Sequence, residues 1–208
     1  MAAGEKMHNV IITGVGGQGN VLSSQLLGQA LVGKGYFVTI GETYGASQRG
    51  GSVMSHIRVS DKKQLSPLIP KGKADIVVGL EPVEALRVLT AYGNPETVVI
   101  SNTRPIYPVD VTSGDEKYPE AEDIQKALED LSSKLYFVPA TEKAMEMGSS
   151  ILGNMIMVGA LLELRMLPLT REDFGRTLEK TFKGQRLEIN LRALEEGGKS
   201  LAQVSRSV

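Results

Sequence analysis

An apolar strand that runs straight into a glycine-rich turn and then a helix is the feature that most constrains the fold of this chain. Residues 9–13 read NVIIT, a β-branched run typical of a buried strand, and the turn Gly14 to Gly19 (GVGGQG) follows without a linker. Apolar residues then recur at helical spacing from Leu22 to Leu31. A second β-rich run at 36–40 completes a strand–helix–strand unit, which predicts two parallel strands joined by a right-handed crossover.

Strands and helices continue to alternate along the rest of the chain. Val53 to Val59 alternates between two sets of side chains, which predicts a half-exposed strand. Short apolar runs typical of strands follow at Ile76–Leu80, Thr97–Ile100 and Leu135–Val138. Helices are predicted after Pro82, over Ala121–Leu131, and from Ser149 to about Glu196.

These elements predict an α/β fold with three layers: a Rossmann-like, mostly parallel sheet between helices, with a helical C-terminal third. Within that third, Thr170 and Asp173 have the spacing of a capping box at a helix start. The whole chain, residues 1–208, is expected to form a single domain, because its length is close to that of one domain.

The charge and hydropathy of the chain exclude several classes of protein. Hydrophobic residues make up 41% and charged residues 23% of the chain, which is typical of a folded protein rather than a disordered one. Its 23 Lys and Arg against 24 Asp and Glu leave a net charge of -1, so we expect neither nucleic acid nor a membrane among its partners. The longest apolar stretch, Ile151–Leu162, is too short to span a bilayer, and a cytoplasmic protein is expected.

The chain contains no cysteine and two histidines, His8 and His56. Without thiolates it cannot ligate an iron–sulfur cluster or perform thiol chemistry. With two histidines, a histidine-based metal site is poorly supplied as well. We therefore predict no metal site on this chain.

The first candidate site is the glycine turn, where Gly14, Gly16 and Gly19 match G-x-G-x-x-G between a strand and a helix. Glycines let the backbone approach an anion, and the helix N-terminus offers free N–H groups. Gly17 adds backbone access, and Glu42 lies just past the second strand. The alternative is that these glycines only permit close packing of strand and helix.

The second candidate site is the loop Tyr44–Ser52, which follows a strand at the edge where open α/β sheets bind ligands. Arg49, among glycines and hydroxyl groups, is suited to pair with a phosphate or carboxylate. The alternative is a mobile turn with a solvated Arg49. The predicted ligand-binding residues of the two sites are Gly14, Gly16, Gly17, Gln18, Gly19, Glu42, Tyr44, Ser47, Gln48, Arg49, Gly50, Gly51 and Ser52.

Other residues that could carry chemistry have ordinary structural explanations. His56, on the polar side of a strand, is interpreted as a surface or interface residue rather than a catalytic base. Glu81 either faces the same crevice as the glycine turn or caps the following helix. Ile151–Met166 is apolar nearly all round, which indicates a central buried helix or a subunit contact. We predict no catalytic residue.

Taken together, the two glycine-rich segments resemble the gamma-type subunit of thiamine-diphosphate-dependent 2-oxoacid:ferredoxin oxidoreductases. The resemblance covers residues 8 to about 196 and is carried by GVGGQG (14–19), YGASQRGGSV (44–53), SHIRV (55–59) and SPLIPKGKADIVVGLEPVEALR (66–87). The SQRGGS form is most similar to the small (beta) subunits of the indolepyruvate-specific enzymes. The chain departs from many of these subunits at Tyr44, where they carry His.

The resemblance implies a non-catalytic subunit of a complex that converts an aryl pyruvate, coenzyme A and oxidised ferredoxin into arylacetyl-CoA, carbon dioxide and reduced ferredoxin. It implies a large catalytic subunit that carries thiamine diphosphate, Mg²⁺ and iron–sulfur clusters, while this chain alone holds no cofactor and contributes to the path of coenzyme A. Three alternatives stay open at this point. They are a subunit acting on pyruvate, 2-oxoisovalerate or 2-oxoglutarate, a free-standing NAD(P)-binding Rossmann domain, and an interaction module without a ligand.

Overall fold

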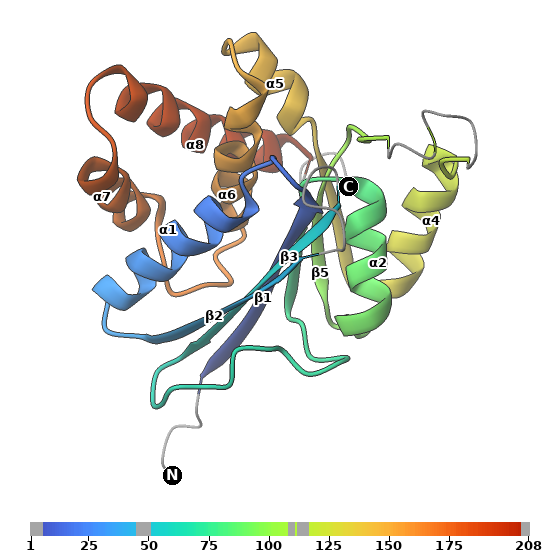
Figure 1. Cartoon of the computed structure of the whole chain (residues 1–208), viewed down its shortest axis with the longest axis horizontal. Helices are drawn as coiled ribbons and strands as arrows, with labels where there is room; N and C mark the ends of the chain where they lie inside the picture. Colours follow the sequence, from blue (N-terminus) through green and yellow to red (C-terminus); the bar gives the residue numbers. More distant parts are fainter. Residues whose placement is uncertain (1–5, 45–50, 108–110, 112–116, 205–208) are drawn as a thin grey trace.

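The computed structural model of the chain describes residues 6–44, 51–107, 111 and 117–204. These residues form a six-stranded sheet with the strand order β2-β3-β1-β4-β5-β6, and helices cover both of its faces (Figure 1). The strands are β1 (Met7–Val15), β2 (Phe37–Tyr44), β3 (Ser52–Ser60), β4 (Ile76–Gly79), β5 (Val98–Asn102) and β6 (Lys134–Val138). The helices are α1 (Asn20–Gly33), α2 (Pro82–Tyr92), α4 (Ala121–Leu131), α5 (Ala140–Glu146), a short 3₁₀ helix η1 (Ser150–Leu152), α6 (Gly153–Glu163), α7 (Arg171–Thr181) and α8 (Gln185–Val204). The predicted three-layer, mostly parallel α/β fold is confirmed.

Among the described strands, β3 alone runs in the opposite direction to the rest of the sheet. β1 and β2 point in the same direction, as predicted, but β3 lies between them and pairs antiparallel with both. Val10 of β1 faces Ile57 of β3, and Ile57 faces Ile40 of β2. The two strands are therefore parallel but not adjacent, because the chain turns back from β2 into β3 and β3 takes the position beside β1.

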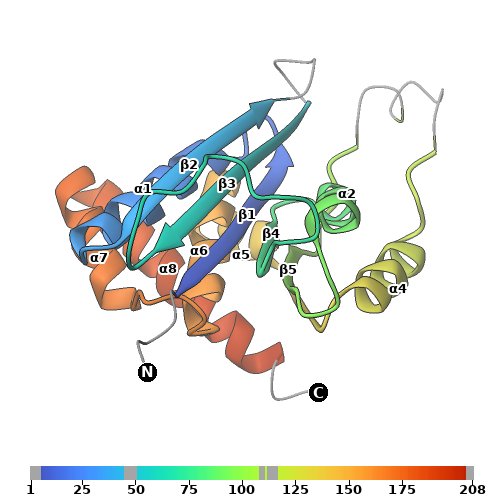
Figure 2. The same ribbon diagram turned by 90° about the horizontal axis from the view of Figure 1, so that it is seen from below.

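Different helices cover the two faces of the sheet. Val10 and Ile12 of β1 point into a core that includes residues of α1, α6, α7 and α8, whereas Ile11 points into a second core with residues of α2 and α4. Figures 1 and 2 show these two groups of helices on opposite sides of the strands. Because β1 is buried on both faces, its apolar run is unbroken. No helix in the described part of the chain is long and apolar enough to cross a membrane.

β3 is also covered on both faces, which corrects the prediction of a half-exposed strand. His56 is 0% and Arg58 9% exposed. The loop after β3, which crosses the sheet in Figure 2, covers them. Arg58 Nη1 donates to the carbonyl oxygen of Ser66 at 3.2 Å, and the Ile69 N–H donates to His56 Nδ1 at 3.3 Å. The prediction that His56 is a surface or interface residue is wrong: it packs edge-on against Tyr92, and burial lowers the pKa of its imidazole.

The C-terminal third is built on a close crossing of α6 and α8. α6 is buried along nearly its whole length, which confirms the interpretation of a central helix. A Cβ added to Gly197 of α8 would lie 1.8 Å from the carbonyl oxygen of Ile156, and one added to Gly159 of α6 would lie 2.1 Å from that of Leu194. The two helix backbones therefore touch at these glycines. α7 begins with the predicted capping box, in which Thr170 and the side chain of Asp173 bond to each other's backbone N–H groups.

We expect Gly197→Ala to lower the free energy of unfolding by roughly 3 kcal/mol, because the new methyl group meets helix backbone that cannot move aside. Gly198→Ala is the matched control. Its Cβ would approach Arg171 Nη1 at 2.7 Å, which is the end of a flexible side chain. The control should be neutral or raise the stability by up to about 1 kcal/mol through helix propensity. Urea denaturation followed by circular dichroism measures both, and equal stabilities would contradict the backbone contact.

Candidate functional site

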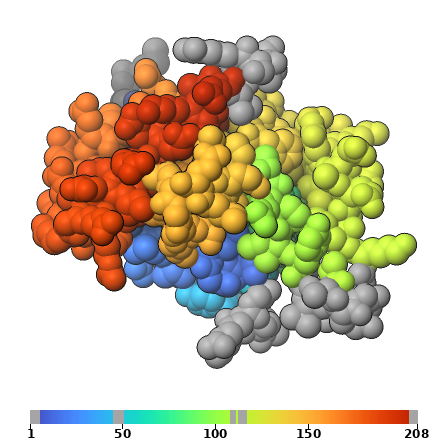
Figure 3. Space-filling view, turned by 90° about the horizontal axis from the view of Figure 1, so that it is seen from above, coloured from blue at the N-terminus to red at the C-terminus, as the bar shows by residue number. Residues whose placement is uncertain are grey.

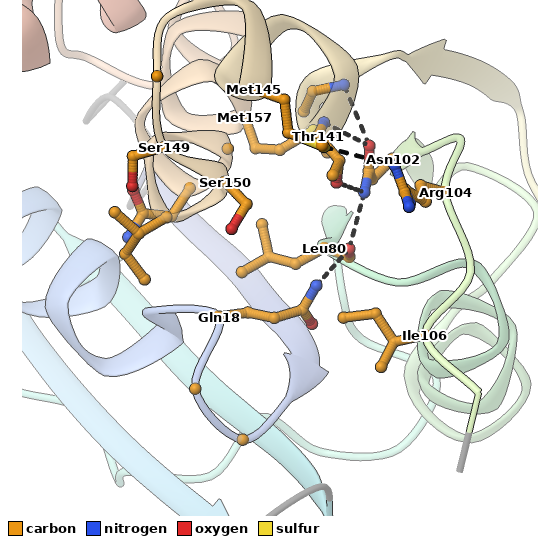
Figure 4. A pocket seen from close by; sticks show the side chains of 17 residues that line it. Gln18, Leu80, Asn102, Arg104, Ile106, Thr141, Met145, Ser149, Ser150 and Met157 are labelled. Atoms are coloured by element: carbon orange, nitrogen blue, oxygen red, sulfur yellow. Dashed lines mark hydrogen bonds between the residues drawn. The ribbon is translucent and has the colours of Figure 1, made fainter. Parts of the chain in front are cut away.

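The turn after β1 is braced by the side-chain amide of Gln18. The Val15 N–H donates to Gln18 Oε1 at 2.6 Å, and Gln18 Nε2 donates to the carbonyl oxygen of Leu80 at 2.8 Å (Figure 4). The amide lies over Gly14, where an added Cβ would be 2.4 Å from Gln18 Oε1. Gly14 thus leaves room for Gln18, and Gln18 joins the end of β1 to the end of β4.

Asn102 reaches the same carbonyl oxygen from the other side. Its Nδ2 donates to the Leu80 oxygen at 3.1 Å and to Thr141 Oγ1 at 2.8 Å. Its Oδ1 accepts from the N–H groups of Ala140 at 3.0 Å and Thr141 at 3.3 Å, which begin α5. Asn102 is 2% exposed, and both atoms of its amide have partners. This one side chain therefore fixes β4, β5 and α5 relative to one another (Figure 4).

Gly19 and Gly17 shape the turn through their backbone. Both have a positive φ, 86° at Gly19 and 101° at Gly17, a backbone conformation that residues other than glycine rarely adopt. A Cβ at Gly19 would lie 2.1 Å from Asn154 Nδ2, whereas nothing lies within 4 Å of one at Gly17. Gly19 is therefore constrained by conformation and by packing, and Gly17 by conformation alone.

A crevice of about 800 Å³ opens at this carboxyl edge, between the turn after β1, the end of β4 and the α5–α6 segment. Its polar lining comes from amides and hydroxyl groups, namely Gln18, Asn102, Thr141, Ser149, Ser150 and Asn154. Leu80, Ile106, Met145, Ile151 and Met157 supply apolar surface. Arg104 carries the charge in the described lining, which contains no carboxylate. Such a lining favours an anionic ligand with an apolar portion.

The base of the second glycine-rich loop is bonded to the first turn. The Gly16 N–H donates to the carbonyl oxygen of Gly51 at 2.9 Å, and Asn20 Nδ2 donates to that of Val53 at 3.0 Å. Ser52 turns toward α2, where its hydroxyl donates to Glu84 Oε2 at 2.5 Å. The predicted site residues Ser47, Gln48, Arg49 and Gly50 lie outside the described residues. Tyr44, at the end of β2, is 64% exposed and is not in the crevice lining.

Glu42 does not occupy the position of a ribose-binding acid. Its two carboxylate oxygens accept from Ser24 Oγ at 2.9 Å and from Ser55 Oγ at 2.7 Å. Because β3 separates β2 from β1, Glu42 is one strand further from the glycine turn than in a dinucleotide-binding unit. The alternative of a free-standing NAD(P)-binding domain depended on Glu42 as the ribose-binding acid, and the position of Glu42 argues against it.

Of the two interpretations of Glu81, the helix cap is confirmed, whereas Glu81 is 2% exposed and is not among the residues that line the crevice. Its Oε2 accepts from the Glu84 N–H at 2.8 Å and so caps α2, while its Oε1 accepts from the Tyr118 hydroxyl and, at 3.4 Å, from the Ile106 N–H. Burial raises the pKa of Glu81, and these three hydrogen bonds oppose the shift. Burial, with Glu81 beside it, raises the pKa of Tyr118 as well. Glu81 thereby fixes the segment that carries Arg104 and Ile106 at the crevice.

Sequence reasoning missed most side chains of the crevice. Asn102 ends β5 and Thr141 follows β6, so the rule that ligands bind at the carboxyl ends of parallel strands could have pointed to both. No local pattern marks Arg104 or Asn154. Within the described ranges there is no group of three metal-ligating side chains.

Comparison with known proteins agrees with the resemblance drawn from the sequence. The pyruvate ferredoxin/flavodoxin oxidoreductase family matches residues 9–200. The indolepyruvate oxidoreductase subunit IorB of Archaeoglobus fulgidus is 39% identical over 189 residues, covering 91% of this chain and 92% of that protein. The subunit of the same name from Thermococcus kodakarensis is 36% identical over 200 residues, covering 96% and 98%.

A solved structure shares the fold. The 2-oxoglutarate:ferredoxin oxidoreductase from Magnetococcus marinus, with 2-oxoglutarate, coenzyme A and succinyl-CoA bound, superposes with a TM-score of 0.72 at 23% sequence identity. The match covers 95% of this chain and 31% of that one. The three-layer arrangement therefore recurs as part of a longer chain.

We expect Gly19→Ala to destabilise the chain more than Gly17→Ala. Both substitutions place a Cβ at positive φ, which costs roughly 1 to 2 kcal/mol. Gly19→Ala must in addition displace the amide of Asn154, which is 5% exposed. Thermal unfolding of the two variants side by side measures the difference. Equal midpoints would show that Asn154 does not press on the turn.

Proposed function

The chain belongs to the family of pyruvate ferredoxin/flavodoxin oxidoreductases, and we propose that it is the small subunit of an indolepyruvate:ferredoxin oxidoreductase complex. The observation that carries the proposal is the similarity, along nearly the whole chain, to indolepyruvate oxidoreductase subunits. The complex would oxidatively decarboxylate an aryl pyruvate, transfer the acyl group to coenzyme A and pass the electrons to ferredoxin. A cytoplasmic location accords with a chain that has no cysteine.

The division of labour follows from the chemistry of the cofactors. Iron–sulfur clusters require thiolate ligands, and thiamine diphosphate is held through Mg²⁺. This chain has no cysteine to offer. A larger catalytic subunit therefore carries thiamine diphosphate, Mg²⁺ and the clusters in the proposed complex, and ferredoxin docks on the complex. This chain contributes no catalytic residue.

We assign the crevice at the carboxyl edge to coenzyme A, which enters as a co-substrate. The exposed backbone at Gly17 lines the crevice and leaves room for a phosphate group, and α1 begins three residues later with the partial positive charge of its N-terminus. Arg104 adds a full positive charge to a lining that is otherwise neutral. Arg49, on the loop next to this turn, remains a predicted second cation for the same ligand.

The proposed function predicts that neither subunit is sufficient alone. The purified chain should be colourless and free of iron, and it should not oxidise indolepyruvate. Mixed with its large subunit under anaerobic conditions, it should support reduction of ferredoxin that depends on indolepyruvate and coenzyme A. Turnover by this chain alone, or full turnover by the large subunit without it, would reject the assignment.

Arg104→Ala should raise the KM for coenzyme A in the complex about tenfold, which corresponds to the loss of about 1.4 kcal/mol from a partly solvated ion pair. Arg49→Ala tests the loop in the same assay. Arg186→Ala is the control, since Arg186 is exposed on α8 and does not line the crevice. If Arg104→Ala and Arg186→Ala give the same KM, the crevice is not the site for coenzyme A.

The preferred 2-oxoacid is tested separately, because Tyr44 departs from the residue expected in indolepyruvate-specific subunits. The assembled complex should turn over indolepyruvate with a higher kcat/KM than pyruvate, 2-oxoisovalerate or 2-oxoglutarate. A preference for one of those three would keep the chain in the family and replace its substrate.

A further inference from the structure

The carboxyl edge of the sheet exposes apolar side chains around the crevice. Six of them, here called the apolar rim, are 38% to 64% exposed: Leu22, Tyr44, Ile106, Tyr107, Met145 and Ile151. Leu22 follows the glycine turn in α1, and Tyr44 ends β2, which points in the same direction as β1. Ile106, Met145 and Ile151 line the crevice itself. Figure 3 looks onto this edge and shows the 140–152 segment, in gold, between the glycine turn in blue and the 100–107 segment in green.

The rim is held in place by buried polar contacts. The Ile106 N–H and the Tyr118 hydroxyl both donate to Glu81, which is 2% exposed. The ring of Tyr107 packs edge-on against that of Tyr118, with ring centroids 5.1 Å apart. The exposed positions of Ile106 and Tyr107 are therefore fixed by contacts inside the protein. A preorganised apolar surface loses little conformational entropy when a partner covers it.

We propose that the apolar rim is the surface by which this chain docks onto the large catalytic subunit, so that the partner closes the crevice. This inference rests on the proposed function. The partner surface must be apolar, with aromatic or aliphatic side chains that fill the space between Ile151 and Tyr107. Protein interfaces concentrate such side chains at their centre and surround them with polar groups.

The size of the face agrees with a stable subunit contact. The rim and its neighbours comprise Tyr44 and the segments 16–22, 51–53, 104–107 and 140–152. Together these segments supply the roughly 20 to 30 residues that one side of a standard interface uses. Ile106, Met145 and Ile151 expose apolar surface around a single crevice, and exposed apolar side chains that cluster in this way mark an interaction site.

The reaction itself also requires the partner at this edge rather than at the opposite one. The crevice assigned to coenzyme A opens between Ile106, Met145 and Ile151, and in the proposed complex the acyl transfer takes place on the large subunit. The thiol end of coenzyme A bound in the crevice must therefore extend out of the crevice mouth and reach the reaction centre of the large subunit. Docking at the rim places that centre over the mouth and keeps water out of the path.

The test compares matched substitutions at the two edges of the sheet. Ile151→Asp and Tyr107→Asp place a charge in the rim, at side chains that are 49% and 57% exposed. Phe37→Asp and Leu131→Asp are the controls, at side chains that are 44% and 42% exposed where β2 begins and α4 ends. Circular dichroism and urea midpoints establish that each purified full-length variant is folded. The dissociation constant for the large subunit is then measured by sedimentation velocity.

We expect each rim substitution to raise the dissociation constant at least tenfold and each control to change it less than twofold. Wild-type binding by both rim variants, or weakened binding by the controls alone, would overturn the proposed interface. If the isolated wild-type chain self-associates and the rim variants are monomeric, the rim is covered by a second copy and the proposal is also overturned. Failure of the wild-type chain to bind any large subunit is a different result, which would reject the proposed function and the interface with it.

Discussion

The carbonyl oxygen of Leu80 is the point on which the carboxyl edge depends, because it accepts hydrogen bonds from both Gln18 and Asn102. The two amides also accept hydrogen bonds, Gln18 from the Val15 N–H at the end of β1 and Asn102 from the N–H groups that begin α5, so that the ends of β1, β4 and β5 and the start of α5 are joined. Leaving a buried amide without its hydrogen-bond partner lowers the free energy of unfolding by about 1 to 3 kcal/mol, so the arrangement resists distortion. The crevice lies directly against this junction, and its shape is therefore a consequence of backbone positions rather than of flexible side chains.

The insertion of β3 between β1 and β2 changes what the glycine fingerprint means. In a dinucleotide-binding unit the strand after the helix lies next to the first strand and delivers an acid to the ribose. Here that place is taken by β3, and Glu42 is bonded to Ser24 and Ser55 instead. What remains of the fingerprint is a tight glycine turn at the N-terminus of α1. A motif match predicted the local turn correctly, but only the strand pairing decides which kind of ligand the turn can serve.

Elements with strong local signals could be predicted from the sequence, and the bounds of α4 and the capping box of α7 are confirmed. The antiparallel pairing of β3 and the burial of His56 could not, because both depend on segments that are distant along the chain. Arg58 looks like a surface residue until the loop after β3 supplies carbonyl acceptors for it. In the candidate site the glycine turn was predicted, whereas the position of Arg104 depends on contacts of its segment with residues distant along the chain, such as those of the Thr103 N–H with the Val138 carbonyl oxygen and of the Ile106 N–H with Glu81.

At the carboxyl edge, buried polar contacts hold the backbone in place while apolar side chains stay exposed to solvent. The edge can therefore be exposed and still have a fixed structure. The apolar core between the sheet and α1, α6, α7 and α8, and the contact of α6 with α8 at Gly159 and Gly197, are formed by residues other than the rim side chains, so the edge need not bury its own apolar side chains to keep the chain folded. Buried polar groups such as Asn102 hold the crevice walls instead. Satisfied polar networks of this kind specify one arrangement, because any alternative leaves donors or acceptors unpaired. A subunit built in this way can present an apolar rim to a partner without reorganising when it binds.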